Sequence, residues 1–118
     1  MEGERHGVLV VEDDPSLRLL SRVNLELAGF AVREAATLAD ARAAVAAERP
    51  DVVFLDVHLG SEQSDDFLDE LRAAGMPVVL VTGTADASSY RQRASEVLAK
   101  PYAPEELVAA ARRLTWGA

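Results

Sequence analysis

The chain has 118 residues, of which 49% are hydrophobic and 27% charged, and its formal net charge is −8. This length suits one compact domain, and the acidic charge argues against a basic surface that binds nucleic acid. Because there is no cysteine, disulfides, thiolate catalysis and cysteine metal sites are excluded.

The chain begins with a strand–helix–strand pattern. Residues 8–11 form a largely β-branched apolar run, which is typical of a buried strand. A helix is predicted next, because Asp14 can cap it, Pro15 suits its first position and Gly29 can end it. Residues 30–33 indicate a second strand.

The same alternation continues in the middle of the chain. Residues 37–40 resemble a capping box with aspartate in the glutamate position, and an alanine-rich helix follows to about Glu48. Residues 52–55 form another apolar run, typical of a buried strand. We interpret residues 57–64 as a polar loop.

The next helix is predicted to begin at Asp65 or Asp66 and to end at Gly75. Residues 78–81 indicate a fourth buried strand. Residues 85–94 have few large apolar side chains, so we expect at best a weak helix there.

The last strand is predicted at residues 97–99, and a final helix begins at residues 103–106 and continues through Leu114. We expect Trp116 to be a partly buried cap on this helix. Five strand–helix units in a row predict an α/β fold, in which helices cover both faces of a parallel sheet through right-handed crossovers. We expect one domain over residues 1–118, with its core at about 7–115.

Polar side chains follow four of the five predicted strands. These residues are Glu12, Asp13, Asp56, Thr82 and Lys100. Because the carboxyl ends of parallel strands meet at one edge of the sheet, we expect these side chains to share one cleft. Neighbouring carboxylates repel one another, and a divalent cation with a preference for oxygen ligands, such as Mg²⁺ or Mn²⁺, relieves that repulsion. The pattern favours phosphoryl transfer to a carboxylate nucleophile.

Four strand-end segments together carry a resemblance to a known family. They are residues 10–14 (VVEDD), 53–59 (VFLDVHL), 81–83 (VTG) and 98–102 (LAKPY). In this order they resemble the CheY-like receiver domain of bacterial response regulators, over about residues 7–115. The resemblance implies a flavodoxin-like, doubly wound sheet with strand order 2-1-3-4-5.

The resemblance also implies a set of metal ligands. It makes Asp56 the phosphoacceptor, with Asp13 and Asp56 as direct ligands of Mg²⁺. The backbone carbonyl of His58 would add a third protein ligand, and Glu12 would reach the metal through water.

The resemblance further implies that Thr82 and Lys100 contact phosphoryl oxygens. The Lys100-Pro101 step resembles one in the family where a cis peptide bond orients the lysine.

Three features depart from the family pattern. The loop after Asp56 lacks the family's proline near Gly60 and its glycine near Asp66. Fewer residues than usual separate Thr82 from Lys100, so we expect a short or mobile fourth helix, as in a receiver subgroup with a Thr-Gly motif. The family's aromatic residue three positions before the lysine is replaced here.

That position is Val97, which cannot make the aromatic swing that accompanies phosphorylation in such receivers. Signal transmission is therefore expected to use ordering of residues 84–95.

The leading interpretation is a phosphoacceptor receiver domain of a two-component system. A histidine kinase or phosphotransfer protein would donate the phosphoryl group to Asp56, and altered protein–protein contacts would carry the signal. The domain would not be an enzyme acting on external substrates, although it would assist its own phosphorylation and dephosphorylation.

Two alternatives stay open at this point. One is a small Mg²⁺-dependent phosphohydrolase with an aspartyl-phosphate intermediate, although His58 stands where such enzymes usually have a second carboxylate. The other is a receiver-like scaffold that is not phosphorylated.

The expected setting is cytoplasmic. The apolar runs are far too short to cross a membrane, and residues 1–7 show no secretory signal. We expect neither direct nucleic-acid binding nor membrane insertion. The downstream partner is unidentified, and formation of a homodimer stays open.

Overall fold

The computed structural model describes residues 5–115, without the side chains of residues 84–86. Trp116 lies outside the described residues, so its predicted capping role is not addressed. Five parallel strands form the main sheet in the order β2-β1-β3-β6-β7. Their bounds are β1 Gly7–Val11, β2 Ala31–Ala35, β3 Val52–Asp56, β6 Val78–Gly83 and β7 Glu96–Lys100. This is the doubly wound, flavodoxin-like order that the resemblance to receiver domains implies.

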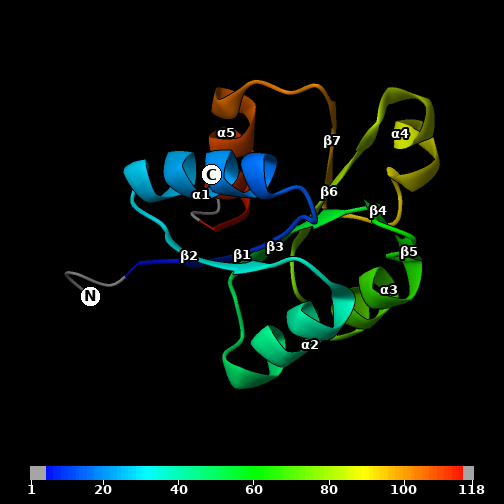
Figure 1. Cartoon of the computed structure of the whole chain (residues 1–118), viewed down its shortest axis with the longest axis horizontal. Helices are drawn as coiled ribbons and strands as arrows, with labels where there is room; N and C mark the ends of the chain where they lie inside the picture. Colours follow the sequence, from blue (N-terminus) through cyan, green and yellow to red (C-terminus); the bar gives the residue numbers. More distant parts are fainter. Residues whose placement is uncertain (1–4, 116–118) are drawn as a thin grey trace.

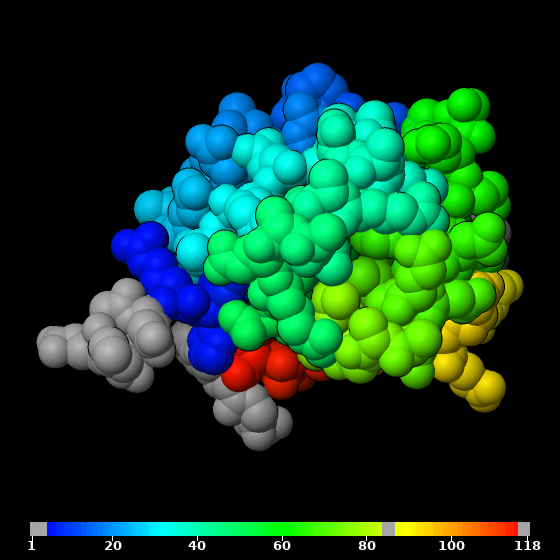
Figure 2. Space-filling model, turned by 90° about the horizontal axis from the view of Figure 1, so that it is seen from below, coloured from blue at the N-terminus to red at the C-terminus, as the bar shows by residue number. Residues whose placement is uncertain are grey.

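Helices cover both faces of this sheet (Figure 1). Their bounds are α1 Pro15–Leu27, α2 Leu38–Ala47, α3 Asp65–Ala73, α4 Thr84–Tyr90 and α5 Pro104–Thr115. One face carries α1 and α5, and the other carries α2 and α3. In the space-filling view, α2 and α3 form much of the visible surface on their side of the sheet (Figure 2). Among the described residues, no helix is both long and apolar enough to span a membrane.

The alternation of side chains along each strand divides the core between the two faces. In β1, Leu9 and Val11 point into the cluster beneath α2 and α3, where Phe67, Leu68 and Leu71 of α3 are buried. The intervening strand residues enter the cluster beneath α1 and α5, together with Leu25, Leu107, Ala110 and Ala111. Each central strand is therefore apolar on both faces, as an internal parallel strand requires.

The capping hydrogen bonds predicted at the starts of α1 and α2 are confirmed. The Asp14 carboxylate accepts hydrogen bonds from the backbone N–H groups of Ser16 and Leu17, which caps α1. Thr37 caps α2 by accepting a hydrogen bond from the N–H of Asp40. The short fourth helix is also confirmed, whereas its mobility stays a prediction.

Two sequence expectations need correction. Residues 57–64 were expected to be a plain polar loop, but they contain an antiparallel hairpin of β4, His58–Leu59, and β5, Glu62–Gln63. A positive φ of 60° at Gly60 allows the chain to turn between these strands. The second strand begins one residue later than expected, at Ala31, because Phe30 is buried in the core before the strand pairs with β1.

Candidate functional site

Strand register brings the strand-end residues together. Val11 of β1 pairs with Leu55 of β3, so the next residues, Glu12 and Asp56, lie side by side. Asp56 in turn pairs with Val81 of β6, which places Thr82 one residue further along the same edge. On the far side of β6, the register ends with Gly83 opposite Lys100. The predicted gathering at the carboxyl edge of the sheet is therefore observed.

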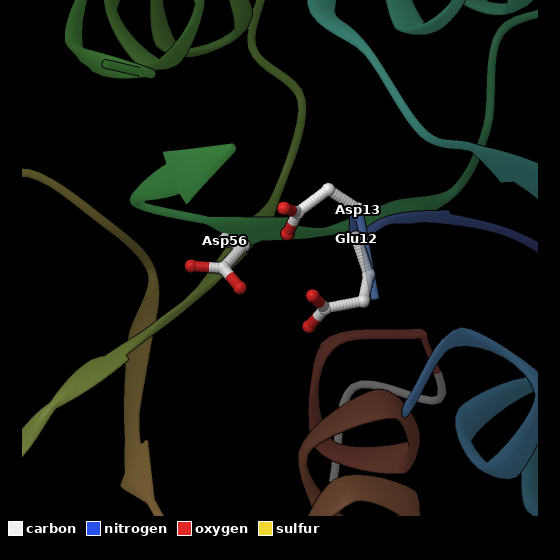
Figure 3. A group of neighbouring side chains, drawn as sticks. All are labelled: Glu12, Asp13 and Asp56. Carbon is white, nitrogen blue, oxygen red and sulfur yellow. The ribbon is translucent and has the colours of Figure 1, made fainter. Parts of the chain in front are cut away.

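Three carboxylates form an acidic cluster at this edge. One oxygen from each of Glu12, Asp13 and Asp56 lies within 4.8 Å of the other two, and the carboxylates face a common space (Figure 3). Glu12 and Asp56 are each 5% exposed, whereas Asp13 is open to solvent. Because every donor is a carboxylate oxygen and one side is open, the cluster fits a hard divalent cation that retains water ligands.

Lys100 supplies positive charge to the same cluster. Its Nζ lies 2.7 Å from Asp56 Oδ2 and 3.5 Å from Glu12 Oε1. Burial disfavours the charged ammonium, but the hydrogen bond and ion pair with Asp56 outweigh burial and raise the pKa of Lys100. The peptide bond from Lys100 to Pro101 is cis, as the resemblance implied.

One lysine does not balance the carboxylates. Burial raises the pKa of Glu12 from the usual 4.5 to about 7, and the nearby charge of Asp56 adds to this effect. A hydrogen bond from the backbone N–H of Asp14 to Glu12 Oε2, 3.1 Å long, partly offsets the shift. The cluster is therefore short of positive charge, which supports its fit to a cation.

The loop after β3 fixes two of the carboxylates. The N–H of His58 donates to Asp56 Oδ1 at 3.1 Å, and the N–H of Gly60 donates to Asp13 Oδ2 at 3.0 Å. With the bond from Lys100 to Asp56 Oδ2, both oxygens of Asp56 accept a hydrogen bond, and the bond from Gly60 engages one oxygen of Asp13. His58 reaches the site through its backbone, whereas its role as a carbonyl ligand stays a prediction.

Thr82 contributes a hydroxyl that is ready to donate. The residue is 1% exposed, and its Oγ1 is one of two buried side-chain atoms in the described part of the chain that have no hydrogen-bond partner. A buried hydroxyl without a partner costs free energy, about 1–3 kcal/mol. An acceptor bound beside Asp56, such as a phosphoryl oxygen, would remove that cost.

Two supporting residues were not identified from the sequence. Arg18 of α1 donates from Nη1 to the backbone oxygen of Glu12 at 2.8 Å and from Nε to Glu34 at 3.1 Å. Ser64 is 1% exposed, and its hydroxyl donates to the backbone oxygen of Asp56 at 2.6 Å. Serine before a helix usually indicates a cap, but Ser64 makes no side-chain capping bond. No local sequence pattern therefore indicated its bond to Asp56.

Comparison with known proteins gives consistent results. A family model described as "Response regulator receiver domain" matches residues 8–112. The DNA-binding response regulator MtrA of Mycolicibacterium smegmatis is 35% identical over 117 residues, which cover 95% of this chain and 51% of MtrA. The transcriptional regulatory protein KdpE of Mycobacterium tuberculosis is 34% identical over 110 residues, covering 89% of this chain and 49% of KdpE. The chain thus spans about half the length of these relatives.

Solved structures agree with the fold. The receiver domain of NtrX from Brucella abortus superimposes with a TM-score of 0.86 at 29% identity, covering 94% of this chain and 99% of that domain. The chemotaxis response regulator CheY4 of Vibrio cholerae gives a TM-score of 0.83 at 27% identity, with the same coverage of both chains.

Proposed function

This chain belongs to the response regulator receiver domain family, and on that premise we propose that Asp56 accepts a phosphoryl group from a histidine kinase or phosphotransfer protein. The observation that carries the proposal is the gathering of three carboxylates beside Lys100. Asp56 lies at the centre of this group, since it contacts Lys100 and borders Glu12.

The transfer itself exchanges one bond to phosphorus for another. A carboxylate oxygen of Asp56 forms a P–O bond to the incoming phosphoryl group while the P–N bond of the donor phosphohistidine breaks. The electron pair of the broken bond stays on the imidazole nitrogen of the donor, which can then take up a proton. The product is an aspartyl phosphate on this chain and a free histidine on the donor.

The acidic cluster would hold Mg²⁺ or Mn²⁺. Asp13 and Asp56 are proposed as direct ligands, with the backbone carbonyl of His58 as a third and Glu12 acting through water. The bound cation would neutralise charge on the phosphoryl oxygens. The pKa of Glu12, which burial and the nearby charge of Asp56 both raise, supports this assignment.

Lys100 and Thr82 would bind the transferred group. The Lys100 ammonium, now paired with Asp56, would turn to a phosphoryl oxygen as negative charge increases there. The Thr82 hydroxyl, which is buried without a partner among the described residues, would donate to another. Both groups are present at the site before the phosphoryl group arrives, so little reorganisation is needed.

The phosphorylated domain would signal through altered contacts with other proteins in the cytoplasm, without turning over an external substrate. The net charge of −8 disfavours direct contact with nucleic acid by these residues. MtrA is named as DNA-binding, and this description applies to that protein.

Intact-protein mass spectrometry after incubation with acetyl phosphate and Mg²⁺ tests this function. We expect the protein to gain one phosphoryl group, and we expect Asp56→Asn to gain none. Asp51→Asn is the matched control, because Asp51 is an exposed aspartate just before β3, at the opposite end of the same strand.

Phosphorylation that persists in Asp56→Asn would refute the assignment. Repeated release of phosphate from a small phosphate ester would instead favour a phosphohydrolase.

A further inference from the structure

The exposed apolar side chains gather on one helix. In the described part of the chain, the large hydrophobic side chains that are exposed all belong to α1. They are Leu19, Leu20, Val23 and Leu27. Their spacings of three, four and seven residues place them on one stripe of the helix, on the side away from the sheet. Leu27 is 82% exposed, and such a stripe favours contact with an apolar partner.

The neighbouring helix α5, on the same face of the sheet, continues this surface (Figure 1). A groove of about 250 Å³ separates the two helices. The residues that line it are Asn24 of α1 and Pro104, Glu105, Val108, Ala109 and Arg112 of α5. Glu105 and Arg112 are exposed. Val108 and Ala109, which lie between them, are half-buried. Helix α5 therefore presents an acid and a base on either side of a small apolar centre.

The pattern on α5 is symmetric about its middle. Glu105 and Arg112 are seven residues apart, which is about two helical turns, so both lie on one face of the helix. Reversing the direction of α5 exchanges these two positions and leaves Val108 and Ala109 at the centre. A second α5 that lies antiparallel on the first therefore places Glu105 of each copy opposite Arg112 of the other.

The stripe on α1 has the same symmetry. Leu20 and Leu27 are also seven residues apart, and Asn24 stands near their midpoint. Asn24 lines the same groove as the centre of α5, so the midpoints of the two helices lie at the same level. Both helices follow parallel strands and run back from the same edge of the sheet, so a rotation that reverses one reverses the other. One twofold axis through both midpoints therefore also places Leu20 of each copy against Leu27 of the other.

We propose that the α1–α5 face, defined by Leu20, Leu27, Glu105 and Arg112, binds a second copy of this chain in an antiparallel, twofold-symmetric dimer. The face combines an apolar stripe with charges that are complementary to themselves under this rotation. That self-complementarity selects a second copy as the partner, because an unrelated protein has no reason to carry the same pattern in reverse. The inference goes beyond the proposed function and does not depend on it.

The dimer is expected to be weak. Exposed charge pairs contribute little, and two copies with a net charge of −8 each repel one another. We expect a dissociation constant on the order of tens of micromolar, so the chain is a monomer below about 1 µM. Unfolding that is measured at such dilution reports on the single copy, in which Leu27 is exposed.

Sedimentation equilibrium at concentrations from below to well above the dissociation constant tests the dimer. We expect the mass of the wild-type chain to rise from that of one copy toward that of two. Glu105→Arg and Arg112→Glu each place like charges opposite one another in both symmetric contacts. Each variant should therefore raise the dissociation constant by about tenfold or more.

Arg72→Glu is the matched control for these variants. Arg72 is an exposed arginine in the last turn of α3, on the opposite face of the sheet, just as Arg112 is in the last turn of α5. The change of charge and its effect on the helix dipole are the same. Arg72→Glu should leave the dissociation constant at the wild-type value.

An exchange of charges identifies the pairing itself. The double variant Glu105→Arg, Arg112→Glu should recover the dimer, because each contact again joins opposite charges. A mixture of the two single variants should form heterodimers at concentrations where each variant alone is a monomer, since both contacts between unlike copies are then complementary.

A wild-type chain that stays monomeric at the highest concentration would overturn the inference. Dimers that survive both single reversals, or that the double variant fails to recover, would place the contact on another face and also overturn it. Phosphorylation of Asp56 is measured separately by mass spectrometry, so each of these results leaves the proposed function intact.

Discussion

The middle and the carboxyl ends of the central strands are stabilised in opposite ways. In their middle, Leu9 and Leu55 are fully buried among other apolar side chains. At their ends, Glu12 and Asp56 are nearly as buried, yet they are carboxylates that share one lysine. Burial lowers the free energy of the fold in the first region and raises it in the second.

This difference shows how the fold can tolerate a strained site. Apolar burial in the strand interiors stabilises the fold by more than the neighbouring charges at the strand ends destabilise it. A cation that binds between the carboxylates would relieve their repulsion, and this relief would favour its binding. Four predictions test the contrast, from the largest expected effect to the smallest.

The largest effect is expected in the strand interior. Leu55→Ala should lower the free energy of unfolding by about 2–5 kcal/mol, because it removes buried methyl groups and leaves a cavity. Urea denaturation measures the loss. Leu27→Ala is the control, since Leu27 is 82% exposed and its truncation should change stability by less than about 0.5 kcal/mol. Similar losses in the two variants would show that the strand interiors do not supply this stabilisation.

The second effect is a pH dependence at the strand ends. Because the pKa of Glu12 is raised to about 7 from 4.5, the folded protein binds a proton that the unfolded chain releases between those values. In metal-free buffer, the contribution of Glu12 to the free energy of unfolding should therefore be greatest below pH 4.5. That contribution should fall by about 1–3 kcal/mol as the pH rises to 7.

Glu12→Gln should lose this dependence and exceed the wild-type stability at pH 8, as urea denaturation at several pH values would reveal. Glu105→Gln, at an exposed glutamate in the first turn of α5, should retain the wild-type profile. If Glu12→Gln were less stable than the wild type at pH 8, the cluster would not be strained.

The third effect concerns the arginine that supports the acidic turn. Arg18→Met should destabilise the fold by about 1–2 kcal/mol, because the backbone oxygen of Glu12 and the carboxylate of Glu34 each lose a charged donor. Arg22→Met is the control, since Arg22 also pairs with Glu34 but is more exposed. Thermal denaturation should rank Arg18→Met below Arg22→Met, and the reverse order would contradict a supporting role for Arg18.

The smallest effect is expected for a charge pair on an open face. Glu70 of α3 accepts two hydrogen bonds from Arg42 of α2, at 3.0 and 2.7 Å, and both side chains are about half exposed. Glu70→Gln should change the free energy of unfolding by less than about 1 kcal/mol, and less at high salt. A larger loss in denaturation experiments would mean that exposure does not separate this pair from the charges at the strand ends.

Much of the fold could be predicted from local patterns. Four of the five strands contain a short apolar run, and a site residue follows each of these runs, as at Asp56 and Lys100. The hairpin at residues 58–63 was missed because its strands have two residues each, too few to show alternation. The partner of Ser64 was missed because a serine before a helix has the same local pattern whether or not it acts as a cap.

The sequence by itself determined the order of strands and helices and the types of chemical group at the strand ends. The tertiary structure decided how those groups interact. The bond from Lys100 to Asp56 joins residues 44 apart, and the bond from Gly60 to Asp13 joins residues 47 apart. Contacts between residues so far apart in the sequence arise only when the sheet assembles, because register and packing bring distant segments together. The burial that raises the pKa of Glu12 arises in the same way.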